Sequence, residues 1–416
     1  MSGTAAFDAA VALALDAAAE AALRAYARHV GAVREPLDGF EDPGPLLTAA
    51  LLARRPGAGV DLDAGGAAAV AVRAWLAASR GRAAHLGVSG RGLAGCVLAL
   101  RQAATAWPAL RPLAVRARAE LVARAERQPW RRDLVAWPDY DLITGASGTL
   151  LTLAADPDGT PADCAATVAH LVGLCTGTGL PGLRLGQHRD DELIGWNYGR
   201  VNCGMGHGAP GVAAALRGAA DAGALPPDGV EALRNVASWL AEQSFVDARG
   251  VRTWPAGGLD ATGRPEPGAG APHAARRQAW CYGTPGTSWT LWEAGRVLGD
   301  PDLTALAEQA AGSFIAAYDD GFYLDEEYPD RVGICHGAAG LLLIFDAFAR
   351  HAGLPGAAGL AEHLAGFLAA RLDRIVAGLD TDPTLLSGAG GVIAALLTYH
   401  GDGPGGRLWL AAFGLR

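Results

Sequence analysis

The stretch Gly337-Ala-Ala-Gly340-Leu-Leu-Leu-Ile-Phe345 joins two glycines, three residues apart, to a run that is apolar on every side. This pattern occurs six times, in segments that begin at Gly92 (GLAGCVLAL), Gly145 (GASGTLLTL), Gly208 (GAPGVAAAL), Gly283 (GTPGTSWTL), Gly337 (GAAGLLLIF) and Gly388 (GAGGVIAAL). Successive copies start 53, 63, 75, 54 and 51 residues apart. That spacing is typical of helical hairpin repeats, in which each unit contains two helices and their loops.

The two helices of each expected hairpin differ in polarity. The glycine-led runs are apolar nearly all round, which predicts inner helices buried on both sides. The stretches between them are amphipathic, and so is residues 11–30, where an apolar stripe lies opposite charged residues spaced i,i+4. Paired glycines allow close backbone approach at the start of each inner helix. We therefore expect an all-α closed ring of hairpins, although an open helical solenoid fits the periodicity equally well.

The composition indicates a well-packed globular protein. Half of the 416 residues are apolar and 19% are charged. The net charge of -9 is spread along the chain without a run of one sign, which disfavours nucleic acid and anionic membranes as partners. No apolar stretch is long enough to span a membrane, and residues 1–23 lack the basic start of a signal peptide. We expect a cytoplasmic protein, and the absence of lysine is typical of a GC-rich bacterial genome.

The positions just before the glycines are rich in chemically active side chains. The residues directly before the first glycine of each copy are Arg91, Thr144, His207, Tyr282, His336 and Ser387, and one step earlier stand Cys281 and Cys335. In a ring, equivalent positions lie at one height and face the central opening, so Cys281, Cys335 and His336 should converge there with His207. Two thiolates and an imidazole are typical zinc ligands, and three protein ligands leave a fourth position open.

The other four cysteines stand outside this register. Cys96, Cys164 and Cys175 are interpreted as small buried packing residues rather than parts of a disulfide framework. Cys203 precedes His207 by four residues and offers a fourth zinc ligand, which would make the metal structural. We favour the open site, because Cys203 does not share the position of Cys281 and Cys335.

Four motifs resemble the LanC family of stand-alone lanthionine cyclases (lanthionine synthetase C), which includes the nisin cyclase. They are Trp280-Cys281-Tyr282-Gly283, Cys335-His336-Gly337, His207-Gly208, and Tyr140-Asp141 ahead of Gly145. The resemblance covers most of the chain and implies a single α,α-toroid domain over residues 1–416, with zinc bound by Cys281, Cys335 and His336. It also implies seven hairpins where six glycine copies are found. We expect about six to seven, with a glycine-poor hairpin near the N-terminus and a small inserted lobe near residues 104–138.

The resemblance implies an activity in lanthipeptide (lantibiotic) biosynthesis. Members of the family add cysteine thiols of a precursor peptide to dehydroalanine or dehydrobutyrine, which forms thioether rings. A free thiol has a pKa of about 8.5, so zinc coordination would raise the small thiolate fraction present at neutral pH. The implied partners are the dehydrated precursor peptide, a lanthipeptide dehydratase and export machinery.

The same reaction requires a group that donates a proton. Thiol addition at the β-carbon creates an enolate, which needs a proton at its α-carbon and stabilisation of its oxygen. His207 is the expected acid, and the resemblance pairs Asp141 with it. Arg277 matches a family arginine and is expected to stabilise the enolate or bind peptide, and Tyr282 matches a tyrosine near the metal. Trp280 and Asn202 are candidate pocket-lining residues.

Other functions remain open at this point. A LanC-like enzyme that adds glutathione to dehydroamino acids would share nearly the same site, and a non-catalytic helical scaffold would use zinc only as a staple. A toroidal glycosidase would need a carboxylate pair, for which Asp319, Asp320, Asp325 and Glu326 are available. These carboxylates lie outside the repeat register. A protein prenyltransferase would need a carboxylate among its zinc ligands, and the sequence offers none in register.

Overall fold

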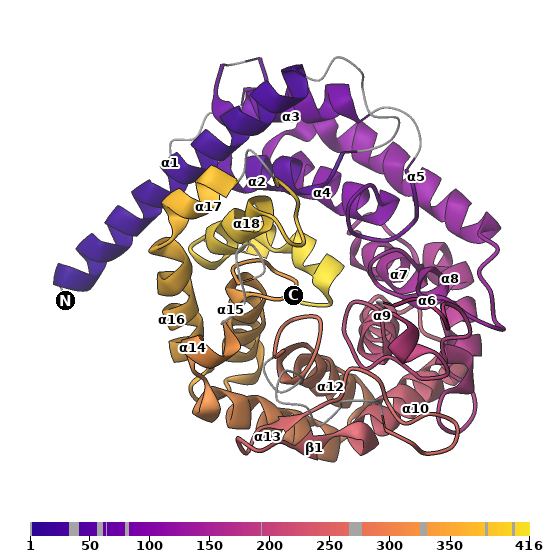
Figure 1. The fold of residues 1–416 in the computed structure, drawn as a ribbon. Helices are drawn as coiled ribbons and strands as arrows, with labels where there is room; N and C mark the ends of the chain where they lie inside the picture. The colour runs from indigo at the N-terminus through magenta and orange to yellow at the C-terminus, as the bar shows by residue number, and fades with distance from the viewer. Residues whose placement is uncertain are drawn as a thin grey trace.

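The computed structural model describes residues 2–32, 41–55, 61–63, 65–79, 83–192, 194–265, 277–324, 331–378, 382–401 and 404–416. Helices follow one another around a central opening, and the end of the chain lies inside the ring (Figure 1). The fold is an α,α-toroid, as predicted. Among the described residues, no helix has the length and hydropathy needed to cross a membrane.

Within the described ranges, seven helices form the inner wall. They are α2 (Gly44–Leu52), α4 (Leu93–Ala106), α7 (Ala146–Ala155), α9 (Ala209–Asp221), α12 (Thr284–Leu298), α15 (Ala338–Ala347) and α18 (Ala389–Tyr399). The six glycine copies begin α4, α7, α9, α12, α15 and α18, as predicted. Every residue of α2 and α15 is buried, because neighbours cover both sides of these helices.

Each inner helix is preceded in the chain by an outer helix. These are α1 (Ser2–Ala32), α3 (Ala67–Ala78), α5 (Arg111–Arg127), α8 (Pro161–Leu174), α10 (Pro227–Gln243), α13 (Pro301–Ala317) and α16 (Ala357–Ala369). They are amphipathic: α5, for example, buries only Ala114, Ala117, Leu121 and Ala125, at helical spacing. The glycine-poor hairpin expected near the N-terminus is α1 with α2.

The remaining elements are short and lie mostly in the loops. They are α6 (Trp137–Tyr140), α14 (Asp320–Tyr323), α17 (Leu372–Gly378), the 3-10 helices η1 (Pro108–Leu110), η2 (Pro181–Leu183), η3 (Gly195–Asn197), η5 (Pro404–Gly406) and η6 (Leu408–Phe413), and the π-helix η4 (Phe348–Ala352). Strands β1 (Phe245–Val246) and β2 (Arg252–Thr253) pair antiparallel. Residues 104–138, where we expected an inserted lobe, contain η1 and α5, and α5 packs on α4 and α8 as an outer helix of the ring.

The ring closes between the first and the last inner helix, which excludes the open solenoid. The Thr48 hydroxyl on α2 donates to the carbonyl oxygen of Gly390 at 3.2 Å, next to the start of α18. The carboxylate oxygen Oδ1 of Asp42 accepts the backbone N–H groups of Gly44 and Leu385, each at 2.8 Å. Residues more than 340 positions apart in the chain are therefore directly bonded.

The second glycine of each copy explains the sequence pattern. A Cβ atom at Gly340 would lie 2.0 Å from the carbonyl oxygen of Ile334, and one at Gly286 would lie 2.1 Å from that of Trp280. No side chain fits such a gap, so the loop can turn back onto its own helix only over a glycine. The closest approach is thus to the loop of the same repeat rather than to a neighbouring helix.

Candidate metal centre

The loops that precede the inner helices are bonded to one another around the central opening. The backbone N–H of Met205 donates to the carbonyl oxygen of Cys281 at 2.7 Å, and the N–H of Cys281 donates to that of Cys335 at 3.3 Å. The N–H of Cys335 in turn donates to Leu386 at 3.0 Å. These bonds hold the chemically active residues of successive repeats at one level.

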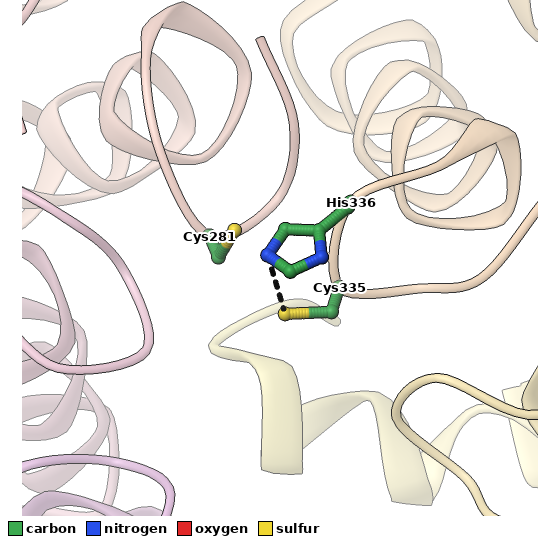
Figure 2. Close-up of side chains that lie close together, drawn as sticks. All are labelled: Cys281, Cys335 and His336. Atoms are coloured by element: carbon green, nitrogen blue, oxygen red, sulfur yellow. Dashed lines mark hydrogen bonds between the residues drawn. The ribbon is translucent and has the colours of Figure 1, made fainter. Parts of the chain in front are cut away.

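Cys281, Cys335 and His336 come together at this level. One ligand atom from each lies within 4.8 Å of the other two, and the distance from Cys335 Sγ to His336 Nε2 is 3.6 Å (Figure 2). A tetrahedral zinc site places two sulfur atoms about 3.8 Å apart, and a sulfur and a nitrogen about 3.6 Å apart. The donor types suit a zinc ion, and the sulfur-to-nitrogen distance matches that of such a site. Cys281 is buried while Cys335 and His336 are half-buried, so one side of the cluster is accessible.

The two thiols are electrostatically different. A hydrogen bond from Cys281 lowers the pKa of Cys335 below the ordinary thiol value, and His336 acts in the same direction against the effect of burial. Burial and the neighbouring Cys335 raise the pKa of Cys281. Cys335 therefore favours the thiolate form that a metal ion requires, even before the ion's own charge acts.

His207 and Asp141 form a second, separate pair. The distance between His207 Nδ1 and Asp141 Oδ2 is 2.6 Å, and Asp141 is fully buried while 30% of the His207 side chain is exposed. Asp141 accepts through its other oxygen, Oδ1, from the backbone N–H of Thr144 at 2.8 Å and from the Thr144 hydroxyl at 3.0 Å. With Nδ1 donating to the carboxylate, Nε2 is the ring nitrogen left for proton transfer.

Two contacts around this pair could not be predicted from the sequence. Trp137 stacks on His207, with ring centroids 4.2 Å apart and planes inclined by 16°. Thr144 had been singled out by its position before Gly145, but its partner Asp141 becomes evident only in the structure. Nothing in the sequence marks Trp137, because its contact depends on how the short helix α6 meets the loop of the next repeat.

The residues near Cys281 have different surroundings. The Tyr282 hydroxyl accepts a hydrogen bond from Asn202 Nδ2 at 3.0 Å, and burial raises the pKa of Tyr282. Arg277 is exposed, and its charge tends to lower the pKa of Cys281. The interpretation of Trp280 as a pocket-lining residue is wrong, because its side chain is only 1% exposed and its indole points to the chain end.

The other cysteines and the acidic candidates lie elsewhere. Cys203 is buried and is not part of the group of atoms within 4.8 Å. Cys96, Cys164 and Cys175 are buried in the core, and all six cysteines are free of disulfides. Asp319 caps α14 and Asp320 contacts His363 at 3.0 Å, next to a cavity of about 470 Å³ on the outer helices. Asp325 and Glu326 lie outside the described residues.

Comparisons with known proteins agree with this geometry. The family model described as lanthionine synthetase C-like protein matches residues 84–405. Among solved structures, nisin cyclase is similar with a TM-score of 0.73 and 20% sequence identity, over 94% of this chain and 96% of that one. At this identity the structural match establishes the fold. No curated protein sequence matches the chain significantly.

Proposed function

The chain belongs to the lanthionine synthetase C-like family, and from this we propose that it is a zinc-dependent lanthionine cyclase. It would add cysteine thiols of a dehydrated precursor peptide to dehydroalanine or dehydrobutyrine. The observation that carries the proposal is the cluster of two thiols and one imidazole within 4.8 Å, one side of which is accessible. A structural zinc site has no need of that accessible side.

Cys281, Cys335 and His336 would hold the zinc ion in this proposal. When bound, zinc supplies a positive centre that favours the thiolate form of a peptide cysteine at neutral pH. The two protein thiolates would offset the charge of the ion, so that a peptide thiolate beside it would stay electron-rich. The peptide thiol would lose its proton to His207 Nε2. Its sulfur would bond to the β-carbon while the carbon–carbon π bond breaks, which leaves an enolate.

His207 would return a proton to the α-carbon, which completes a redox-neutral addition. Its Nε2 is the free ring nitrogen, and Asp141 fixes the ring through Nδ1. Stacking on Trp137 further restricts rotation of the imidazole. Arg277, at the exposed rim, would stabilise the enolate oxygen or bind the peptide, and Tyr282 would line the site beside Cys281.

The test separates metal binding from catalysis. We expect Cys281→Ala, Cys335→Ala and His336→Ala to lose stoichiometric zinc while keeping the helical circular dichroism spectrum of the wild type. His207→Ala should retain zinc and lose cyclisation, measured as the loss of free thiols from a dehydrated precursor peptide. Cys164→Ala is the matched control, because Cys164 is a buried cysteine outside the cluster.

Three outcomes would contradict the proposal. Purified wild-type protein without zinc would remove the metal-dependent mechanism. Unfolding of the chain on zinc removal would favour the zinc-stapled scaffold. Persistence of all thiols in a cognate dehydrated peptide, with consumption of glutathione instead, would favour the glutathione-adding enzyme.

A further inference from the structure

The last residues of the chain occupy the centre of the ring (Figure 1). We call residues 408–416 the C-terminal plug; it contains η6 and contacts the inner helices α4 and α7. Three ring side chains donate to its backbone at consecutive carbonyl groups. Trp280 Nε1 bonds to the oxygen of Phe413 at 2.9 Å, and Trp289 Nε1 and Arg217 Nη2 bond to that of Gly414 at 3.0 and 3.2 Å.

The plug also fits closely against the loop that carries His207. Gly414 has a φ of +68°, a conformation that favours glycine. A Cβ atom there would lie 2.3 Å from Cε of Met205, two residues before His207, and 3.0 Å from Cβ of Ala214. The backbone of the plug is therefore held in one place by both shape and hydrogen bonds.

Trp280 connects this plug to the metal centre. Its buried ring meets Phe413 edge-on, with centroids 5.1 Å apart and planes inclined by 76°. The same side chain packs at the start of α15, because a Cβ atom added at Gly340 would lie 3.0 Å from the Cβ of Trp280. A Cβ atom added at Gly206 would lie 3.7 Å from Cζ3 of Trp280. Trp280 thus touches the repeats of His336 and His207, and it is covalently joined to Cys281.

We propose that the C-terminal plug positions the metal ligands through Trp280, a role that rests on the proposed zinc site. An indole has one donor, Nε1, and a buried donor needs its acceptor, so the carbonyl of Phe413 fixes the orientation of the ring. The fixed ring sets the place of the Cys281 loop relative to the start of α15. Trp280 would act as a positioning residue, because its side chain is only 1% exposed and its one donor is bonded to the plug.

Two matched substitutions test this role. Trp280→Phe and Trp289→Phe each remove one indole hydrogen bond to neighbouring carbonyls of the plug, and both side chains are almost fully buried. Only Trp280 adjoins a ligand. In a chelator competition, we expect Trp280→Phe to lower zinc affinity at least tenfold, while Trp289→Phe changes it less than twofold at a comparable melting temperature.

A spectroscopic measurement distinguishes positioning from general loss of stability. With Co²⁺ in place of zinc, the thiolate-to-cobalt absorption should change in Trp280→Phe and remain that of the wild type in Trp289→Phe. If Trp280→Phe does not fold, Phe413→Leu, which keeps the carbonyl acceptor but loses the ring contact, should shift zinc affinity in the same direction.

Equal zinc affinities and equal cobalt spectra in the two tryptophan variants would overturn the role of Trp280 while leaving the cyclase proposal intact. For Phe413→Leu, wild-type zinc affinity would overturn it in the same way. A wild-type protein that holds neither ion would overturn the proposed function and this inference together.

Discussion

Thr144 is the residue whose contribution to the proposed reaction is most directly testable. Its hydroxyl donates to Asp141 Oδ1 while His207 bonds to the other carboxylate oxygen. We predict that Thr144→Val lowers the rate constant of cyclisation by about tenfold, because a hydrogen bond to a charged group contributes about 1.5–3 kcal/mol and the backbone N–H of residue 144 still restrains Asp141. Peptide cyclisation rates, with zinc content measured in parallel, check this.

Thr144→Ser is the control, since it keeps the hydroxyl at the same position and should retain most of the rate. KM and bound zinc should remain unchanged in both variants. Equal rate losses in the valine and serine variants would show that the methyl group rather than the hydroxyl matters at this position.

Among individual residues, the sequence predicts the ones whose place in the ring follows from their position in the repeat. Cys281, Cys335 and His336 stand at equivalent positions before glycines, and the structure places them together. Trp137 and the buried role of Trp280 could not be predicted, because each depends on a tertiary contact with a segment distant in the chain. An aromatic residue beside a motif has the same appearance in sequence whether it lines a pocket or fills the core.

Among the elements, the glycine-led inner helices make a specific prediction about stability. Gly340→Ala should destabilise the protein by about 2–4 kcal/mol, because its Cβ would lie 2.0 Å from the carbonyl oxygen of Ile334 and the loop would have to move. That loop carries Cys335, so zinc affinity should fall as well. Urea unfolding monitored by circular dichroism gives the free energy.

Gly366 in α16 provides the matched control, since a Cβ there meets nothing within 4 Å. Gly366→Ala should stabilise the protein by about 0.5–1 kcal/mol through helix propensity alone. A Gly340→Ala variant as stable as the wild type would contradict the explanation given for the glycine pattern.

The same pattern explains which helices the sequence could predict. Six inner helices carry both glycines, because each must lie against the carbonyl of its own preceding loop. Helix α2 begins with Gly44 and Pro45 but has Leu47 at the position of the second glycine, so the repeat count was one short of the ring. At α2, Asp42 instead bonds to the backbone N–H groups of Gly44 and Leu385. A single aspartate forms no repeated sequence pattern, so this role could not be predicted.

On the scale of the whole molecule, the loops form a belt of hydrogen bonds around the opening. The N–H groups of Ser89, Leu142, Met205, Cys281 and Cys335 each donate to the loop of the next repeat. The belt reaches the N-terminal hairpin through the bond from Leu385 N–H to Asp42 Oδ1. A half-buried carboxylate thus joins the last repeat to the first.

This closure makes the stability of the ring depend on pH. Burial raises the pKa of Asp42 to about 7, against the two backbone hydrogen bonds that it accepts. Because the folded state then binds a proton that the unfolded state has released, wild-type stability should fall as pH rises from about 4 to about 7. Above about pH 7 this contribution of Asp42 to stability is fully lost, and below about pH 4 it is fully present.

Asp42→Asn should remove this dependence, since an amide oxygen accepts the same two hydrogen bonds without a charge. Each pKa unit corresponds to about 1.4 kcal/mol, so the stability of the variant relative to the wild type should increase by a few kcal/mol between pH 4 and pH 8. Urea unfolding at both pH values measures it, with Asp302→Asn as the control at an exposed position of α13. A parallel pH profile for Asp42→Asn and the wild type would mean that the carboxylate closing the ring stays ionised throughout.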